Sequence, residues 1–192
     1  MRKFLRMIYI ILIYFLEQLV KIECIALHNL TEQKGNGFLL RLWLKMKAVK
    51  FGKSIYMHAP FYLFQRGALK IGNYCSFGEF TKIWNFVDVE FGDEFLGAAG
   101  LTVLTGGHDP DTLNPKFKPV VIGKRVWCGA NVIIMPGVTV GDDVVIGSGA
   151  LVTADIPNES IVVGSPARVV GKVDMTKRKA NFYTRSKFQN KE

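Results

Sequence analysis

The sequence lacks the features of a disulfide-stapled secreted protein and of a membrane-spanning one. Its three cysteines, Cys24, Cys75 and Cys128, form an odd count without paired spacing, which favours a reducing compartment over a disulfide framework. Its uninterrupted apolar run, residues 7–16, is shorter than the roughly 20 apolar residues that cross a bilayer. The residues that follow the run are not the small ones of a signal-peptide cleavage site. We therefore expect a cytoplasmic protein.

Histidine is also scarce, and the chain contains only His28, His58 and His108. A zinc site needs several ligands that converge on one ion. These histidines are separated by 30 and 50 residues, and His28 lies outside the repetitive part of the chain. We therefore expect no metal ion.

Basic residues outnumber acidic ones by 25 to 16, and the resulting net charge of +9 is concentrated at the two ends of the chain. Such asymmetry indicates an anionic partner, which can be a phosphate-bearing cofactor, an acidic membrane surface, an anionic glycan or a nucleic acid. No nucleic-acid-binding module can be recognised. We therefore favour a cofactor together with a membrane or a glycan, and expect no nucleic acid.

A six-residue period organises the chain between Ile122 and Ile156. One apolar series comprises Ile122, Cys128, Ile134, Val140, Ile146 and Val152, and a second comprises Val126, Val132, Val138, Val144, Ala150 and Ile156. Neither an amphipathic helix nor a half-buried strand has this period. It is typical of short strands joined by tight corners, three of which close one coil of a parallel β-helix. Cys128 takes an inward position in this pattern, which predicts a buried structural thiol.

The same period begins less regularly at residue 51. Phe51, Ile71 and Phe91, each followed by glycine, recur at a spacing of 20 residues, which we interpret as coils of 18 residues with a two-residue insertion at one corner. Gly97 takes an inward position, so we expect that flat to be thinly packed or closely approached. The sequence therefore predicts a mainly β fold, a hexapeptide-repeat solenoid over residues 51–172.

The period stops after the third coil, where a loop over residues 104–120 leaves the solenoid. Loops on rigid scaffolds commonly carry function. His108 opens this loop directly after Thr105-Gly-Gly107, and is the histidine best placed for chemistry. Lys116 and Lys118 in the same loop could face an anionic acceptor.

The two ends of the chain fall outside the solenoid. We expect a helical extension over residues 1–50, with a second short helix over residues 38–49, and a basic tail over residues 173–192. Residues 7–16 fit a helix that packs on the solenoid end or between subunits. They also fit a helix on a membrane surface, with the preceding basic residues facing anionic lipid, or a spanning anchor or signal sequence.

The run VIGKRVWCGANVIIMPGVTVGDDVVIGSGALVTADIPNESIVVGSPARVV resembles the hexapeptide-repeat acyltransferases, and most closely the galactoside and maltose O-acetyltransferases. The resemblance implies a left-handed parallel β-helix, although right-handed crossovers are the rule for parallel strands. It implies transfer of an acetyl group from acetyl-CoA to a hydroxyl of a sugar or glycan precursor. It also implies a homotrimer, in which the histidine and the cofactor face meet across the cleft between two subunits.

The resemblance carries over a set of site residues. It implies that His108 is the general base, because an imidazole is largely neutral at pH 7 and can accept the hydroxyl proton, and that the backbone N–H of Ala130 stabilises the oxyanion. Cofactor-binding positions are Trp127, Ala130, Ser148, Thr153 and Arg168, with Arg168 as the phosphate partner and Lys172 assisting it. Ala154 stands where the family usually has lysine.

On the acceptor side, the resemblance implies that Asn85 binds the sugar, and an asparagine that satisfies a coil corner is an equal alternative. Acetyl transfer to a non-sugar or amine acceptor, such as an antibiotic or an amino sugar, is an alternative function, as is a non-catalytic β-helix scaffold. The histidine spacing disfavours the carbonic-anhydrase branch of the same fold. The inner face of the membrane is an alternative to a purely cytoplasmic location.

Overall fold

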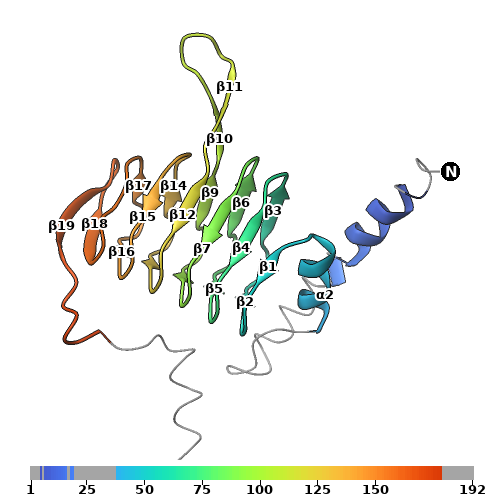
Figure 1. Ribbon diagram of the computed structural model, residues 1–192, viewed down its shortest axis with the longest axis horizontal. Helices are drawn as coiled ribbons and strands as arrows, with labels where there is room; N and C mark the ends of the chain where they lie inside the picture. The colour runs from blue at the N-terminus through green and yellow to red at the C-terminus, as the bar shows by residue number, and fades with distance from the viewer. Residues whose placement is uncertain (1–4, 6, 17, 20–37, 179–192) are drawn as a thin grey trace, which may run out of the picture.

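The computed structural model describes residues 5, 7–16, 18–19 and 38–178. Three parallel sheets form the flats of a solenoid, and successive coils contribute one strand to each (Figure 1). Face A contains β1 (Lys50–Phe51), β4 (Leu69–Ile71), β7 (Val89–Phe91), β12 (Val120–Ile122) and β15 (Thr139–Val140). Face B contains β2 (Tyr56–Met57), β5 (Ser76–Phe77), β8 (Leu96–Gly97), β13 (Trp127–Cys128), β16 (Val145–Ile146), β18 (Ser160–Val163) and the antiparallel β19 (Arg168–Lys172). Face C contains β3 (Tyr62–Gln65), β6 (Lys82–Asn85), β9 (Thr102–Leu104), β14 (Ile133–Ile134) and β17 (Leu151–Val152).

The strand register confirms the predicted solenoid. Phe51 pairs with Ile71, and Ile71 with Phe91, so the 20-residue spacing is one full coil. Each coil passes through faces A, B and C in turn, and the two extra residues lie at the corner from face C to face A, hereafter edge CA. The predicted loop also leaves the third coil at edge CA, as a β-hairpin of β10 (Gly106–His108) and β11 (Pro115–Phe117) that stands out from the body (Figure 1).

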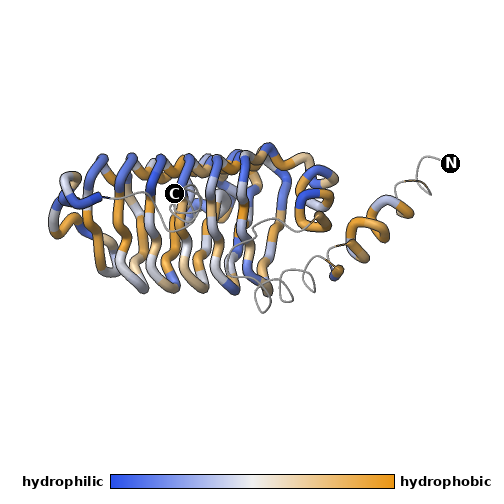
Figure 2. Tube along the Cα trace, turned by 90° about the horizontal axis from the view of Figure 1, so that it is seen from below, coloured by the Kyte–Doolittle hydropathy of each residue, from blue (hydrophilic) through white to orange (hydrophobic). Residues whose placement is uncertain are grey.

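Helices lie at the N-terminal end of the solenoid. In α2 (Phe38–Met46), Leu40, Trp43 and Leu44 are buried, and the Trp43 ring meets Phe61 edge to face at a centroid distance of 5.4 Å. This helix therefore closes the end of the core. Residues 7–16 and 18–19 are also helical and extend beyond α2 as a largely apolar segment (Figure 2). No helix in the described ranges is long and apolar enough to cross a bilayer.

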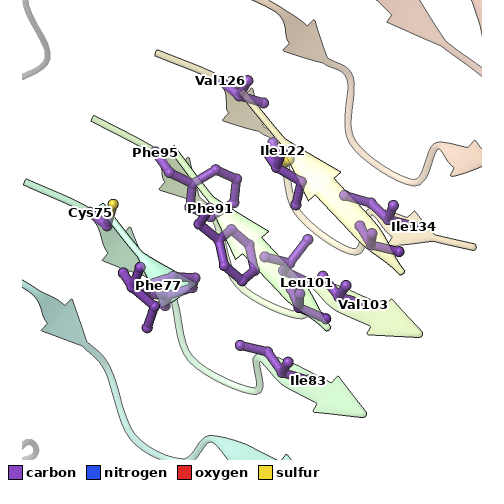
Figure 3. Packing of buried hydrophobic residues seen from close by; sticks show 14 of the residues in the cluster. Cys75, Phe77, Ile83, Phe91, Phe95, Leu101, Val103, Ile122, Val126 and Ile134 are labelled. Carbon is purple, nitrogen blue, oxygen red and sulfur yellow. The ribbon is translucent and has the colours of Figure 1, made fainter. Parts of the chain in front are cut away.

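The core is the inward aliphatic column that the six-residue period predicts, with aromatic rings in the second and third coils. Phe77, Phe91 and Phe95 pack together with ring centroids 4.8 to 5.3 Å apart (Figure 3). A Cβ on Gly97 would lie 3.0 Å from both the Phe95 ring and Leu101. Phe95 and Leu101 thus fill the space that a side chain at position 97 would take. Of the two expectations for this flat, close approach is observed and thin packing is not.

The corner from face A to face B carries a partly buried ion pair. Arg125 donates from Nε and Nη2 to the two carboxylate oxygens of Asp143, at 2.7 and 2.6 Å, and Arg178 approaches the same carboxylate at 3.8 Å. The Asp143 side chain is only 7% exposed. The hydrogen bonds from Arg125 lower the pKa of Asp143 below its ordinary value. This pair links the fourth and fifth coils to the start of the C-terminal tail.

We expect Asp143→Asn to lower the free energy of unfolding at pH 7 by about 2 kcal/mol, the scale of a hydrogen bond to a charged group. Because folding lowers the carboxyl pKa, the stabilisation is present above the unfolded pKa of about 3.9 and is lost as the pH falls through the folded value. Denaturant titrations at pH 7 and pH 3 measure both effects. Glu90→Gln, which breaks the exposed pair with Lys70, is the control and should cost below about 1 kcal/mol. Equal losses in the two variants would contradict the assignment.

Candidate functional site

His108 is exposed and lies on the hairpin at edge CA, opposite Pro115. The base of the hairpin is fixed by Thr105, which is fully buried. Its hydroxyl donates to the Trp84 carbonyl and accepts from the Val87 N–H, both at 3.2 Å. The chain therefore leaves the coil at a fixed point, and His108 follows three residues later.

The two glycines before His108 have different surroundings. A Cβ on Gly106 would lie 2.5 Å from the Phe86 ring, and that ring stacks on Phe117 of β11 with centroids 5.2 Å apart. Glycine at position 106 is thus required by packing. A Cβ on Gly107 would meet nothing within 4 Å. The chain therefore leaves open space directly beside His108.

Asp109 orders the turn of the hairpin. Its Oδ1 accepts hydrogen bonds from the N–H groups of Asp111 and Thr112 at 3.1 and 2.9 Å, and its Oδ2 pairs with the Lys116 ammonium. The Lys116 hydrogen bond is the main cause that lowers the pKa of Asp109 to about 2. Lys116, which the sequence offered as a contact for an anionic acceptor, is therefore engaged within the hairpin. The signal available in the sequence was an aspartate and a lysine seven residues apart in the same loop.

The predicted cofactor residues fall mainly on face B. The Trp127 indole is 49% exposed, and its strand is followed in register by β16, β18 and finally β19, which carries Arg168 and Lys172. Three strand spacings separate Trp127 from β19, about 14 Å in all. Arg168 and Lys172 are exposed, and their side chains donate to the carbonyls of Ala167 and Asn158. Face B thus offers an aromatic surface at one end of a column and two cations at the other.

Ala130 and Ser148 lie together at the corner from face B to face C, hereafter edge BC. The N–H of Ala130 donates to Ser148 Oγ at 3.2 Å. The oxyanion role of this N–H stays a prediction, and it requires the Ser148 hydroxyl to turn away. Thr153 is exposed and follows β17, which places it at edge CA instead.

Asn85 is fully buried at edge CA. Its Nδ2 donates to the carbonyls of Gly67 and Ala68 at 3.0 and 3.3 Å, at the two-residue insertion of the preceding coil, while its Oδ1 is buried without a partner in the described chain. Gln65 and Thr105 occupy the same place in the neighbouring coils. Asn85 thus has the surroundings of a corner asparagine, and its contact with a sugar stays a prediction.

These placements separate the candidate residues into two groups. His108, Thr153 and Asn85 belong to edge CA, whereas Trp127, Ala130, Ser148, Arg168 and Lys172 belong to face B and edge BC. The hairpin that carries His108 also projects away from the body (Figure 1). One chain therefore does not bring the imidazole and the Ala130 N–H to a common point.

Within the described ranges, no three His, Cys, Asp or Glu side chains are grouped to hold a metal ion. Cys75 and Cys128 are buried, and burial raises the pKa of each thiol to about 12. Neither thiol is therefore a thiolate nucleophile at neutral pH. Cys24 lies outside the described residues.

Known proteins share this repeat and this fold. The bacterial transferase hexapeptide (six repeats) family matches residues 119–154. The galactoside O-acetyltransferase of Escherichia coli strain K12 is 34% identical over 130 residues, which are 64% of this chain and 63% of that protein. The chain thus spans less than two thirds of the length of this curated relative.

Two solved structures show the same solenoid. A hexapeptide-repeat acetyltransferase of Vibrio cholerae, complexed with acetyl coenzyme A, has a TM-score of 0.67 and 22% identity over 84% of this chain and 87% of that one. A maltose O-acetyltransferase of Clostridium difficile has a TM-score of 0.53 and 26% identity over 80% and 86%. The fold defines a hexapeptide-repeat β-solenoid. The chain thus contains the hexapeptide repeat of this family model and is similar in sequence to an acetyltransferase that has it, as its sequence indicated.

Proposed function

We propose that the protein is an acetyl-CoA-dependent O-acetyltransferase that acts on a hydroxyl of a sugar or glycan precursor. The observation that carries the proposal is His108, an exposed imidazole on a braced hairpin, with open space beside it at Gly107. The E. coli relative is a galactoside O-acetyltransferase and the C. difficile neighbour acts on maltose, as their names state. Both names support a sugar as the acceptor.

The chemistry needs one base and no acyl-enzyme. His108 takes the proton of the acceptor hydroxyl as the oxygen attacks the thioester carbonyl. A carbon–oxygen bond forms, the carbon–sulfur bond then breaks, and the proton passes from the imidazole to the leaving CoA thiolate. The N–H of Ala130, once the Ser148 hydroxyl has turned, donates to the oxyanion. The buried thiols of Cys75 and Cys128 take no part.

Acetyl-CoA lies along face B in this proposal. The Trp127 indole packs against the pantetheine arm, and Arg168 binds phosphate with Lys172 beside it, because a guanidinium fork suits phosphate oxygens. Both cations are exposed at the far end of face B from Trp127, as a ligand with a phosphorylated end requires. They also supply positive charge that the family lysine, replaced by Ala154, would have given.

The complete site is formed between copies of the chain. His108 at edge CA of one copy faces the Ala130 corner and face B of the next, in a closed ring of three. The separation of the two residue groups within one chain supports this arrangement, since a head-to-tail contact joins different surfaces of identical subunits.

The test is release of free CoA from acetyl-CoA with a panel of galactosides, maltosides, amino sugars and hydroxylated antibiotics, alongside calorimetry of CoA binding. We expect CoA to bind and a sugar hydroxyl to be the productive acceptor. Turnover with amines alone would replace O-transfer by N-transfer. Absence of CoA binding would overturn the proposal in favour of a non-catalytic scaffold.

A further inference from the structure

The helix over residues 7–16 exposes apolar side chains around its whole circumference. The four consecutive residues Tyr9, Ile10, Ile11 and Leu12 are each between 47% and 59% exposed. Because consecutive residues of an α-helix are about 100° apart, these four face all sides. Leu16 is buried at the C-terminal end of the run. The described chain thus leaves this surface uncovered.

The helix is nevertheless attached to the solenoid. The Tyr9 hydroxyl donates to the Met46 carbonyl of α2 at 2.8 Å, and Leu16 joins the core cluster. The helix extends from the N-terminal end of the solenoid, beyond α2 and opposite the end that carries β19 (Figures 1 and 2). A ligand of this helix would therefore leave the His108 hairpin and the cations of β19 free.

The charges that precede the helix and the length of the helix indicate which kind of partner can cover its apolar surface. Arg2, Lys3 and Arg6 precede the apolar run, and no acidic residue occurs before Glu17. Ten helical residues extend about 15 Å, half of the hydrocarbon core of about 30 Å. The helix can therefore enter one leaflet, but it is too short to cross the bilayer. A second copy of the helix would cover one stripe of its surface, whereas acyl chains cover every side.

We propose that residues 7–16 insert into the headgroup and acyl-chain boundary of an anionic phospholipid membrane and anchor the solenoid there by its N-terminal end. The apolar side chains enter the lipid, and the basic residues that precede them pair with phosphate groups. Such a helix binds through the apolar area that it buries and through attraction to anionic lipid. The apolar and the electrostatic contributions to vesicle binding should therefore each be measurable.

The first test is sedimentation of the full-length protein with vesicles of phosphatidylglycerol and phosphatidylcholine. We expect binding that Ile10→Asp/Ile11→Asp weakens at least about ten-fold, because two carboxylates then enter the apolar layer. The control is Phe80→Asp/Leu113→Asp, which introduces the same two negative charges at exposed apolar residues away from the helix. Phe80 lies on the solenoid and is 51% exposed, and Leu113 lies in the hairpin turn and is 72% exposed. The control variant should bind as the wild type does. An equal loss in the two variants would overturn the proposal.

The second test asks whether vesicle binding depends on the basic residues next to the helix or only on the net positive charge of the chain. Arg2→Gln/Lys3→Gln/Arg6→Gln should weaken binding to anionic vesicles, whereas Arg185→Gln/Lys187→Gln/Lys191→Gln, with the same loss of three charges, should not. Wild-type binding should fall on vesicles of phosphatidylcholine alone. If the protein binds no vesicles, the membrane proposal fails. If Ile10→Asp/Ile11→Asp changes only the oligomeric state, measured by sedimentation velocity, the helix is a contact between copies and the proposal also fails. None of these measurements uses turnover, so they stand apart from the proposed activity.

Discussion

His108→Ala should lower acetyl-CoA turnover by about 10²- to 10⁴-fold, the range that a positioned general base contributes. The exposed imidazole contributes no buried apolar area, and the hairpin is held by Thr105 and by the Phe86–Phe117 stack. The affinity for CoA and the stability should therefore stay at wild-type levels. Steady-state release of CoA, calorimetry and thermal unfolding measure the three quantities.

The control for His108 is His58→Gln, which changes a histidine two coils away along the solenoid. Its turnover should remain within a few-fold of wild type. If His58→Gln lost as much activity as His108→Ala, or if His108→Ala kept wild-type turnover, the general-base assignment would be wrong.

Gly92→Ala should cost about 3 kcal/mol of unfolding free energy, at the upper end of the range for overpacking. A Cβ at this position would lie 2.6 Å from the carbonyl carbon and oxygen of Gly123 in the next coil. Those are backbone atoms of a stacked corner, so relief requires the movement of a coil and not of a side chain. Denaturant unfolding, followed by circular dichroism, gives the difference.

Gly107→Ala is the matched control, since its Cβ would meet nothing within 4 Å. Its stability should lie within about 0.5 kcal/mol of wild type. A comparable loss in both variants would contradict the assignment of the cost to the stacked corner, because the effect of Gly→Ala on the unfolded chain favours the folded protein.

The solenoid could be predicted because its period is dictated by stacking. Each coil must place an apolar side chain at the same inward position as its neighbours. Ile122, Cys128 and Ile134 are therefore recognisable in the sequence as the inward residues of faces A, B and C. The hairpin could not be predicted in the same way. β10 and β11 pair in antiparallel fashion through Gly106, Gly107 and Pro115, which have neither the alternation nor the composition of ordinary strands.

The candidate site was only partly visible in the sequence. His108 could be singled out because it is the one histidine at an interruption of the period. The Ala130 N–H donates to Ser148 Oγ, 18 residues away in the sequence. This hydrogen bond depends on the rotamer of Ser148, and the repeat pattern of the sequence does not specify that rotamer. Asn85 is buried because its amide donates to two carbonyls of the two-residue insertion at edge CA. The sequence shows that an insertion exists, but only the structure shows where these carbonyls point.

The most direct measurement mixes two inactive variants of the chain. His108→Ala removes the base from one edge, and Trp127→Ala/Arg168→Ala weakens the cofactor face on another, so each alone should be nearly inactive at limiting acetyl-CoA. After co-assembly in equal amounts, about one quarter of the interfaces in a random head-to-tail trimer would combine an intact His108 with an intact cofactor face. We predict that turnover recovers toward that fraction. If the two chains are shown to mix and turnover stays at the sum of the single variants, the site does not lie between copies and the account is contradicted.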